Sequence, residues 1–166
     1  MPREADDVPD DELALMVCAE LSPTGAAKAL AAFGSAGAVR RASVRALGAI
    51  ASIGHRAVAV HDALKLADPR AERRAMRAAE VRMVVLGDPD YPPQLAMIDD
   101  PPLGLWVRGD VGVLQRLAVA IVGARRASSY GIAQAGRFAG FLAEQGLTVV
   151  SGGARGVDAQ AHRAAL

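Results

Sequence analysis

Cysteine is almost absent from this sequence, which contains only Cys18. A single cysteine excludes a disulfide framework within the chain and a zinc site built from several thiolates. The three histidines, His55, His61 and His162, have no metal-ligand spacing with it. We therefore expect a protein of the reducing cytoplasm that binds no metal and needs no cofactor, with Cys18 buried in its core.

Long apolar runs, aromatic residues and net charge are also scarce. No uninterrupted apolar stretch approaches the roughly 20 residues that span a bilayer, and the acidic start is unlike a signal peptide, so no membrane partner is expected. Aromatic residues make up 4% of the chain and hydrophobic residues 52%, many of them alanine, which predicts closely packed helices and short aliphatic strands. The formal net charge of +1 gives no overall attraction to nucleic acid.

Charge is nevertheless unevenly distributed, and local clusters matter more than the sum when a ligand carries phosphates. The clusters are Asp6, Asp7, Asp10, Asp11 and Glu12 at the start, Arg70, Arg73, Arg74, Arg77 and Arg82 in mid-chain, and the pair Arg125 and Arg126.

The hydrophobic pattern divides the chain into a helical part and a part with strands. We expect a disordered acidic tail over residues 1–11, a small helical domain of the helix-hairpin-helix or SAM-like kind over 12–66, and a basic helical connection over 67–80. Apolar strand-like runs begin at Val81, so residues 81–166 are expected to form a partial Rossmann-like domain with a parallel sheet. The predicted fold class is therefore α/β.

One glycine turn in the helical part resembles a phosphate-binding hairpin. The segment Ile50–Ala57 is loosely similar to the helix-hairpin-helix motif, in which a glycine turn points backbone N–H groups at a phosphate. His55 or Arg56 stands where the second glycine of that motif is usual. A helical bundle without a ligand is the alternative, and the acidic start opposes phosphate, so we expect this part to be accessory.

The C-terminal part contains two strand–loop–helix segments in succession. Val119–Val122 is a continuous apolar run typical of a strand buried on both faces, and a helix is predicted from Gly131 to Gln145. Thr148–Val150 is the next strand, and another helix opens near Asp158. The two strands of such a unit are parallel, so both loops emerge at one sheet edge, where open α/β sheets bind ligands.

Both loops have the composition of a phosphate-binding site. Glycines let the backbone approach a ligand and leave N–H groups free, and the helix starts add a positive dipole end. Serine hydroxyls can donate hydrogen bonds, and an arginine can form two to one phosphate. The candidate residues are Gly123, Arg125, Arg126 and Ser128 in the first loop and Ser151, Gly152, Gly153 and Gly156 in the second.

The better-known phosphate-binding signatures are missing. Only Gly123 and Gly131 punctuate the first loop, so there is no G-x-G-x-x-G, and the P-loop lysine is absent. A dinucleotide or nucleoside triphosphate is therefore disfavoured as ligand. In the alternative interpretation, the glycines only permit tight strand-to-helix turns.

Two segments resemble signatures of the DNA-processing protein A family. Residues 122–131, V-G-A-R-R-A-S-S-Y-G, are similar to the family's V-G-[TS]-R-x-x-S-x-Y-G, with Ala124 in place of threonine or serine. Residues 151–166 are similar to S-G-x-A-x-G-[IV]-D-x-x-A-H-x-x-A-L, and the stretch from Tyr91 to Gly109 resembles the family's lead-in. The similarity is tight over about residues 83–166 and loose before them.

This resemblance implies a single-stranded-DNA-binding recombination mediator that loads the RecA recombinase on incoming DNA during natural transformation. Its partners would be single-stranded DNA and RecA, the complete protein would be a homodimer, and the phosphate-binding candidates would line the DNA pocket. The resemblance also implies further strands after Leu166, so we expect this chain to lack part of the family's domain and to expose an apolar sheet edge.

Catalysis is the alternative from another class of function. Ser151, Asp158 and His162 suggest a triad, and the last two lie four residues apart on one helix face. However, Ser151 lacks the G-x-S-x-G elbow, and a structural pair or a helix cap explains Asp158 and His162 more simply. A nucleotide hydrolase similar to the lysine-decarboxylase-like phosphoribohydrolases would need a P-G-G-x-G-T loop and a catalytic glutamate, which are absent. We expect no enzyme activity.

Two aromatic residues are candidates for stacking on bases. They are Tyr91 and Trp106, although Trp106 lies within an apolar strand and is expected to be in the core.

Overall fold

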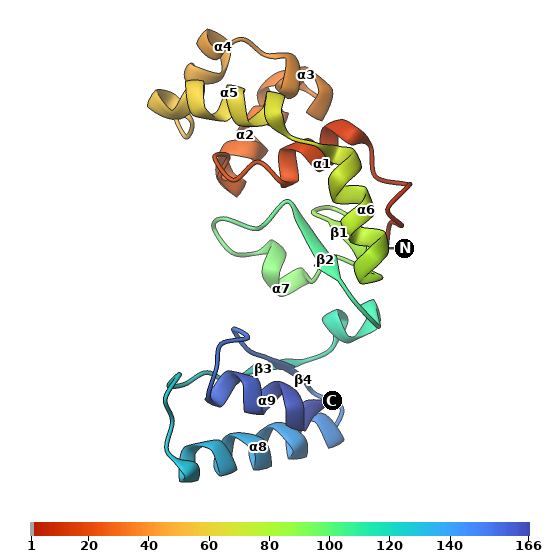
Figure 1. Ribbon diagram of the computed structural model, residues 1–166, viewed down its shortest axis with the longest axis vertical. Coiled ribbons are helices and arrows are strands. Elements are labelled where there is room, and N and C mark those ends of the chain that lie inside the picture. Colours follow the sequence, from red (N-terminus) through yellow and green to blue (C-terminus); the bar gives the residue numbers. More distant parts are fainter. Residues whose placement is uncertain (1) are drawn as a thin grey trace. The chain divides into compact units, whose positions relative to one another are not determined.

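The computed structural model of the chain describes residues 2–166 and divides into two compact units (Figure 1). The first unit ends at Val111, and the second runs from Gly112 to Leu166. The first is mainly helical and carries a two-stranded antiparallel sheet, whereas the second contains a pair of parallel strands with helices. The chain therefore has the mixed α/β fold that its sequence predicts. None of the helices in residues 2–166 is long and apolar enough to cross a membrane.

Short helices form most of the first unit. They are α1 (Asp10–Met16), α2 (Pro23–Phe33), α3 (Ala36–Arg41), α4 (Val44–Gly48), the 3-10 turn η1 (Gly54–Arg56), α5 (Ala57–Leu66) and α6 (Pro69–Ala79). Serine side chains cap the N-termini of α2, α3 and α4. The hydroxyls of Ser22, Ser35 and Ser43 each accept a hydrogen bond from the N–H three residues further on. Such caps satisfy N–H groups that have no partner within the helix.

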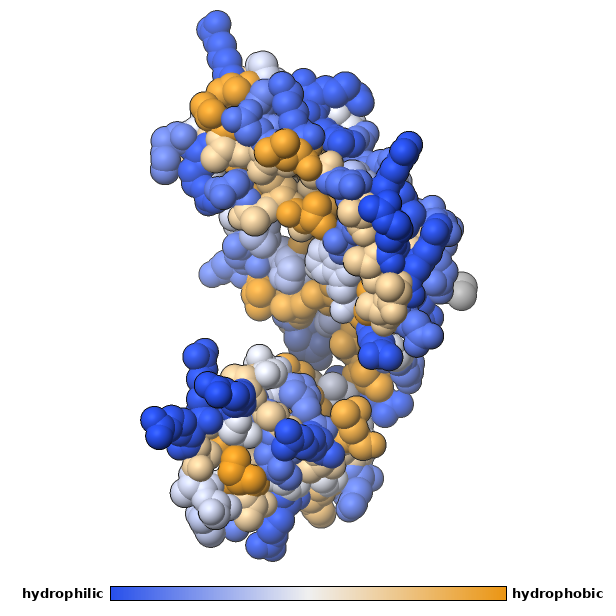
Figure 2. Space-filling model, viewed as in Figure 1, coloured by the Kyte–Doolittle hydropathy of each residue, from blue (hydrophilic) through white to orange (hydrophobic). Residues whose placement is uncertain are grey.

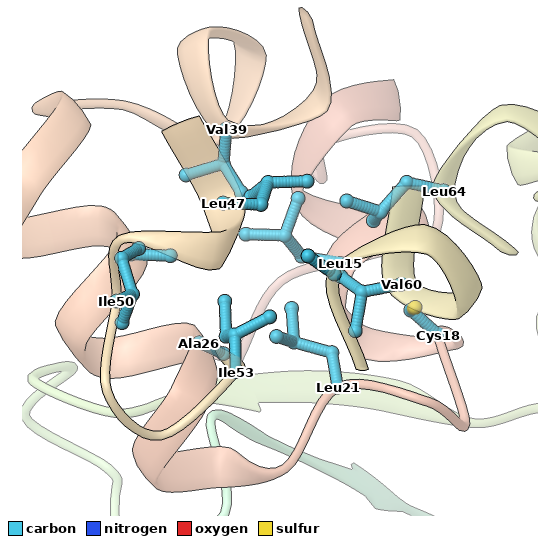
Figure 3. Close-up of a cluster of buried hydrophobic side chains, with 12 residues drawn as sticks. Leu15, Cys18, Leu21, Ala26, Val39, Leu47, Ile50, Ile53, Val60 and Leu64 are labelled. Carbon is cyan, nitrogen blue, oxygen red and sulfur yellow. The ribbon is translucent and has the colours of Figure 1, made fainter. Parts of the chain in front are cut away.

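The core of the first unit is aliphatic (Figure 3). Val39, Leu47 and Leu64 have no exposed surface, and they meet where α3, α4 and α5 come together. Cys18 belongs to the same cluster and is 5% exposed, as expected from the sequence. Burial of these side chains from water is the main force that holds the short helices together.

The residues before α1 are part of the packed structure. Arg3 and Met83 exchange two backbone hydrogen bonds of 2.7 and 2.9 Å, and Ala5 and Val8 are buried. Arg73 of α6 donates to the carbonyls of Ala5 and Val8 over 2.9 and 2.8 Å. This order differs from the disordered tail expected over residues 1–11, of which Met1 lies outside the described residues.

The acidic start and the arginines of the first unit neutralise each other. The pairs are Arg73 with Asp10 (2.7 Å), Arg77 with Asp6, Arg3 with Glu12 (2.9 Å) and Arg40 with Asp11 (3.1 Å). Arg73 and Arg77 of the mid-chain arginine cluster are therefore paired with the acidic start, which also pairs with Arg3 and Arg40.

The antiparallel sheet belongs to the first unit. It pairs β1 (Arg82–Val85) with β2 (Gly104–Val107), and α7 (Pro93–Ala96) lies between them in the chain. For this reason the two compact units divide after Val111. The expected domain boundary near residue 80 lies earlier in the chain and stays a prediction. The 3-10 turn η2 (Val111–Gln115) leads into the second unit.

The second unit is a strand–helix–strand–helix arrangement. Its elements are β3 (Ala118–Ala120), α8 (Ser129–Glu144), β4 (Thr148–Val150) and α9 (Val157–Ala165). The strands are parallel, with Val119 opposite Val149, which confirms the predicted unit. The two helices pack through small residues, of which Ala139 and Ala161 are fully buried.

The strand β3 is less buried than its apolar sequence predicts. Val122 is 72% exposed just after the strand, and Val150 of β4 is 50% exposed. The expectation of a strand buried on both faces is therefore wrong for the described residues. The reason is that the parallel sheet there consists of only two strands, so their side chains lack neighbours on one side.

Candidate phosphate-binding site

The two glycine-bearing loops lie at the same end of the second unit. The first follows β3 and leads into α8 at Ser128, and the second follows β4 and leads into α9 at Gly156. Because β3 and β4 run parallel in direct register, their carboxyl ends and the loops after them share one edge (Figure 1). This is the edge at which open α/β sheets bind ligands.

Hydrogen bonds tie the two loops to each other. They join the Val157 N–H to the Ala124 carbonyl (3.3 Å), the Gly123 N–H to Oδ1 of Asp158 (3.3 Å) and the Ser151 hydroxyl to the Ile121 carbonyl (2.7 Å). Each bond connects the chain after β3 with the chain after β4. The loops therefore form one structure, and a change in one is transmitted to the other.

Gly156 permits the closest approach between the loops. A Cβ atom there would lie 2.3 Å from the Ala124 carbonyl oxygen and 2.8 Å from that of Arg125. Its φ of 90° and ψ of −127° are also open to almost no residue except glycine. The start of α9 therefore packs directly on the backbone that precedes and includes Arg125.

The other glycines of the site differ in what surrounds them. A Cβ atom at Gly123 would strike the side chain of Val157, and one at Gly152 would lie 3.0 Å from Oδ2 of Asp158. Gly153 has nothing within 4 Å of that position. Close packing within the protein thus accounts for Gly123 and Gly152, whereas a φ of 71° accounts for Gly153, which has open space beside its backbone.

Three arginines project from the loops without a protein partner. Arg125 and Arg126 are exposed, and no residue of the described chain forms an ion pair or hydrogen bond with their side chains. The same holds for Arg155, which lies between Gly153 and Gly156 and was not among the residues predicted from the sequence. Its position inside the second glycine loop is a signal that could have identified it.

Charge is segregated between the two units. The second contains six arginines against Glu144 and Asp158, a net charge of +4, which leaves the first with 13 basic and 16 acidic residues, a net charge of −3. Figure 2 shows hydrophilic side chains at the end of the second unit that carries the loops, on the left in this view. The second unit alone therefore has the charge that attracts an anion.

The two serines of the site have different roles. Ser128 begins α8 by accepting a hydrogen bond from the Gly131 N–H over 3.2 Å, so its own hydroxyl proton stays available to a ligand. Ser151 donates its proton to the Ile121 carbonyl. Ser128 can therefore donate to a phosphate at the start of α8, while Ser151 connects the ends of the two strands.

The starts of the two helices also differ. The first turn of α8 contains no acidic residue, so its N–H groups and dipole can act on an anion. The first turn of α9 contains the buried acidic residue Asp158, whose negative charge disfavours a second anion there. Of the two helix starts at this edge, that of α8 is therefore the better suited to an anion.

No catalytic triad forms from Ser151, Asp158 and His162 in the described chain. Ser151 donates to a backbone carbonyl, Asp158 accepts from the Gly123 N–H, and His162 makes no side-chain hydrogen bond with either. Within residues 2–166, no group of three or more histidine, cysteine, aspartate or glutamate residues could hold a metal ion.

The two candidates for stacking on bases, Tyr91 and Trp106, lie in the first unit, and their burial differs from what the sequence predicts. Trp106 is 40% exposed, so its assignment to the core is wrong: it lies on a strand of a two-stranded sheet, which leaves its ring half uncovered. Tyr91 is buried instead and donates to the Pro102 carbonyl over 2.7 Å, and this burial raises the pKa of its hydroxyl. Tyr91 cannot stack on a base in this conformation.

The glycine turn of the first unit has few free groups. Gly54 adopts a φ of 47° before α5, and the neighbouring Arg56 is engaged with Glu20 over 3.0 Å. Its guanidinium group is therefore already paired within the protein, unlike those of Arg125, Arg126 and Arg155.

Known proteins resemble this chain mainly over its C-terminal half. Protein Smf of Escherichia coli K12 is 45% identical over 76 residues, which cover 46% of this chain and 20% of that protein. The putative DNA processing protein DprA of Mycobacterium tuberculosis H37Rv is 48% identical over 67 residues, 39% of this chain and 17% of that protein. The chain thus matches about a fifth of the length of these relatives.

A solved structure shares the fold over nearly the whole chain. The X-ray structure of DNA processing protein A from Streptococcus pneumoniae superposes with a TM-score of 0.66 at 23% identity, covering 95% of this chain and 54% of that one. The sequence model of the family described as DNA recombination-mediator protein A matches residues 82–166, which include both loops. The chain belongs to the DNA recombination-mediator protein A family.

Proposed function

We propose that this chain binds single-stranded DNA through its phosphates, at the edge of the second unit formed by the two glycine loops. The binding residues are Arg125, Arg126 and Arg155, with the hydroxyl of Ser128 and the start of α8. In this proposal the protein is a recombination mediator that brings RecA to single strands and acts as a homodimer without catalysing a reaction itself.

The observation that carries the proposal is the set of three unpaired guanidinium groups on loops that are tied together. An arginine without a protein partner keeps all of its N–H donors for a ligand, and the planar group fits two phosphate oxygens. Their spread over both loops favours a ligand with several phosphates in a row over a single phosphate group. The family to which the chain belongs is described by its action on DNA, in agreement with this chemistry.

Recognition of this kind does not depend on base sequence. Phosphate contacts position a nucleic acid and carry no sequence information, whereas sequence is read from base edges. The edge presents arginines, a serine hydroxyl and backbone N–H groups, which suit phosphates, beside the exposed ring of Tyr130 at the start of α8. The first unit has a net negative charge and its arginines are largely paired, so we propose an accessory role for it.

The test is a titration of a labelled oligothymidylate with the 166-residue chain at several salt concentrations. The logarithm of the affinity should fall with the logarithm of the salt concentration, with a slope of about −0.7 for each phosphate neutralised. Arg125→Ala should weaken binding of every sequence alike and make the slope shallower by about one phosphate contact.

The matched control is Arg163→Ala, because Arg163 is exposed in the last turn of α9 and its replacement changes the net charge equally. This variant should retain most of the affinity and nearly the whole slope. Equal losses in Arg125→Ala and Arg163→Ala would mean that only the overall charge of the unit matters and would overturn the proposed site.

A further inference from the structure

Asp158 is a buried acidic residue without a cationic partner. It is 6% exposed and is the only charged residue among the buried residues of the described chain. No lysine, arginine or histidine of the described residues lies within ion-pair distance of its carboxylate. Burying a carboxylate without a cation is costly, and a negative charge beside a phosphate site also repels the ligand. Its presence there calls for a compensating role.

The contacts of Asp158 indicate such a role. Its Oδ1 accepts the hydrogen bond from the Gly123 N–H in the first loop, and its Oδ2 fills the space beside Gly152 in the second. The neighbouring Val157 donates its N–H to the Ala124 carbonyl, and its side chain packs on Gly123. The carboxylate is also in the first turn of α9, where the helix dipole favours a negative charge.

We infer that Asp158 is a positioning residue, which holds the loop after β3 against the loop after β4 and thereby fixes Arg125 and Arg126 for phosphate binding. This inference rests on the proposed function. By holding the two arginines in place, Asp158 raises the affinity for DNA by more than the repulsion between its negative charge and the phosphates lowers it.

The inference predicts an effect opposite in sign to simple electrostatics. If the charge alone mattered, any neutral replacement would strengthen the binding of an anion by about twofold. If the hydrogen bond matters, Asp158→Ala weakens binding, because the Gly123 N–H loses its acceptor. Asp158→Asn keeps an acceptor oxygen in the same place and removes the charge, so it binds as well as the natural chain or slightly better.

The experiment uses the 166-residue chain and its variants Asp158→Ala and Asp158→Asn. The control is Glu144→Ala, which removes an exposed acidic residue at the far end of α8. Amide hydrogen exchange without DNA and the affinity for labelled oligothymidylate are measured for all four. We expect faster exchange over residues 121–128 and about tenfold weaker binding in Asp158→Ala alone, as for the loss of one hydrogen bond to a buried charged group.

Exchange within residues 135–144 of α8 should be the same in all variants, which separates loosening of the loop from unfolding of the unit. Unchanged exchange in the loop of Asp158→Ala would overturn the inference. The inference would also be overturned if Asp158→Ala bound oligothymidylate as tightly as Asp158→Asn does. If the natural chain does not bind oligothymidylate at all, the proposed function fails, whereas the exchange measurement still decides whether Asp158 holds the loop.

Discussion

Replacement of Gly156 by alanine should disrupt the second unit more than any other small change in the loops. The backbone at Gly156 has a φ of 90°, and a residue with a side chain is strained there by about 1–3 kcal/mol. The added Cβ atom would also lie 2.3 Å from the Ala124 carbonyl oxygen, and relief of such an overlap costs about 1–3 kcal/mol more. The expected loss is therefore about 2–6 kcal/mol.

This loss is comparable with the whole stability of the unit. At about 0.05–0.15 kcal/mol per residue, a unit that runs from Gly112 to Leu166 is stable by about 3–8 kcal/mol. Gly156→Ala should therefore either unfold the second unit in a large fraction of molecules or push the start of α9 away from Ala124. Both outcomes separate the loops and should reduce the binding of oligothymidylate.

The assay is urea unfolding followed segment by segment with hydrogen exchange. Trp106, the only tryptophan, lies in the first unit, so its fluorescence reports on that unit and should change little in Gly156→Ala. Gly131→Ala is the control, because a Cβ there would find its nearest atom, Oγ of Ser128, at an ordinary 3.5 Å. That variant should be neutral or more stable by up to about 1 kcal/mol, since alanine favours a helix. Equal stability of the two variants would refute the close packing of the loops.

Two further predictions concern single side chains. Ser128→Ala removes the cap of α8 and should destabilise the second unit by about 1 kcal/mol in urea unfolding, whereas Ser129→Ala, one residue further on, should change it little; the reverse order would show that Ser128 does not cap the helix. Burial raises the pKa of the Cys18 thiol, so it stays protonated at neutral pH and should react with a thiol reagent only when the first unit unfolds. The pKa of the Cys18 thiol is higher in the folded than in the unfolded chain. Its contribution to stability is therefore present at neutral pH and is lost as the pH rises above the pKa that the thiol has in the unfolded chain. Rapid labelling of Cys18 in the folded protein would contradict its buried position.

The parts of the fold that depend on local sequence could be predicted. Thr148–Val150 is a strand with the predicted bounds. The parallel pairing of β3 and β4 followed from the helix between them, since such a crossover connection joins neighbouring parallel strands. These features require only neighbouring residues and general rules of chain geometry.

Features that depend on which distant segments meet could not be predicted. The pairing of Asp6 and Asp10 with α6 orders a segment whose composition indicates disorder. Within the site, the composition of the loops indicated phosphate binding, but the partner of Ser151 depends on the distance between the ends of β3 and β4. The buried position of Asp158 against Gly123 likewise follows only from the packing of α9 on the first loop.

The most direct test of the proposed site is a map of amide hydrogen exchange in the 166-residue chain with and without saturating oligothymidylate. We expect DNA to slow exchange over residues 121–131 and 151–157, at the edge that carries Arg125, Arg126 and Arg155, and to leave the helical turn around Gly54 unchanged. Protection concentrated over residues 50–57, with none in the two glycine loops, would place the nucleic-acid site in the first unit and overturn the proposed site.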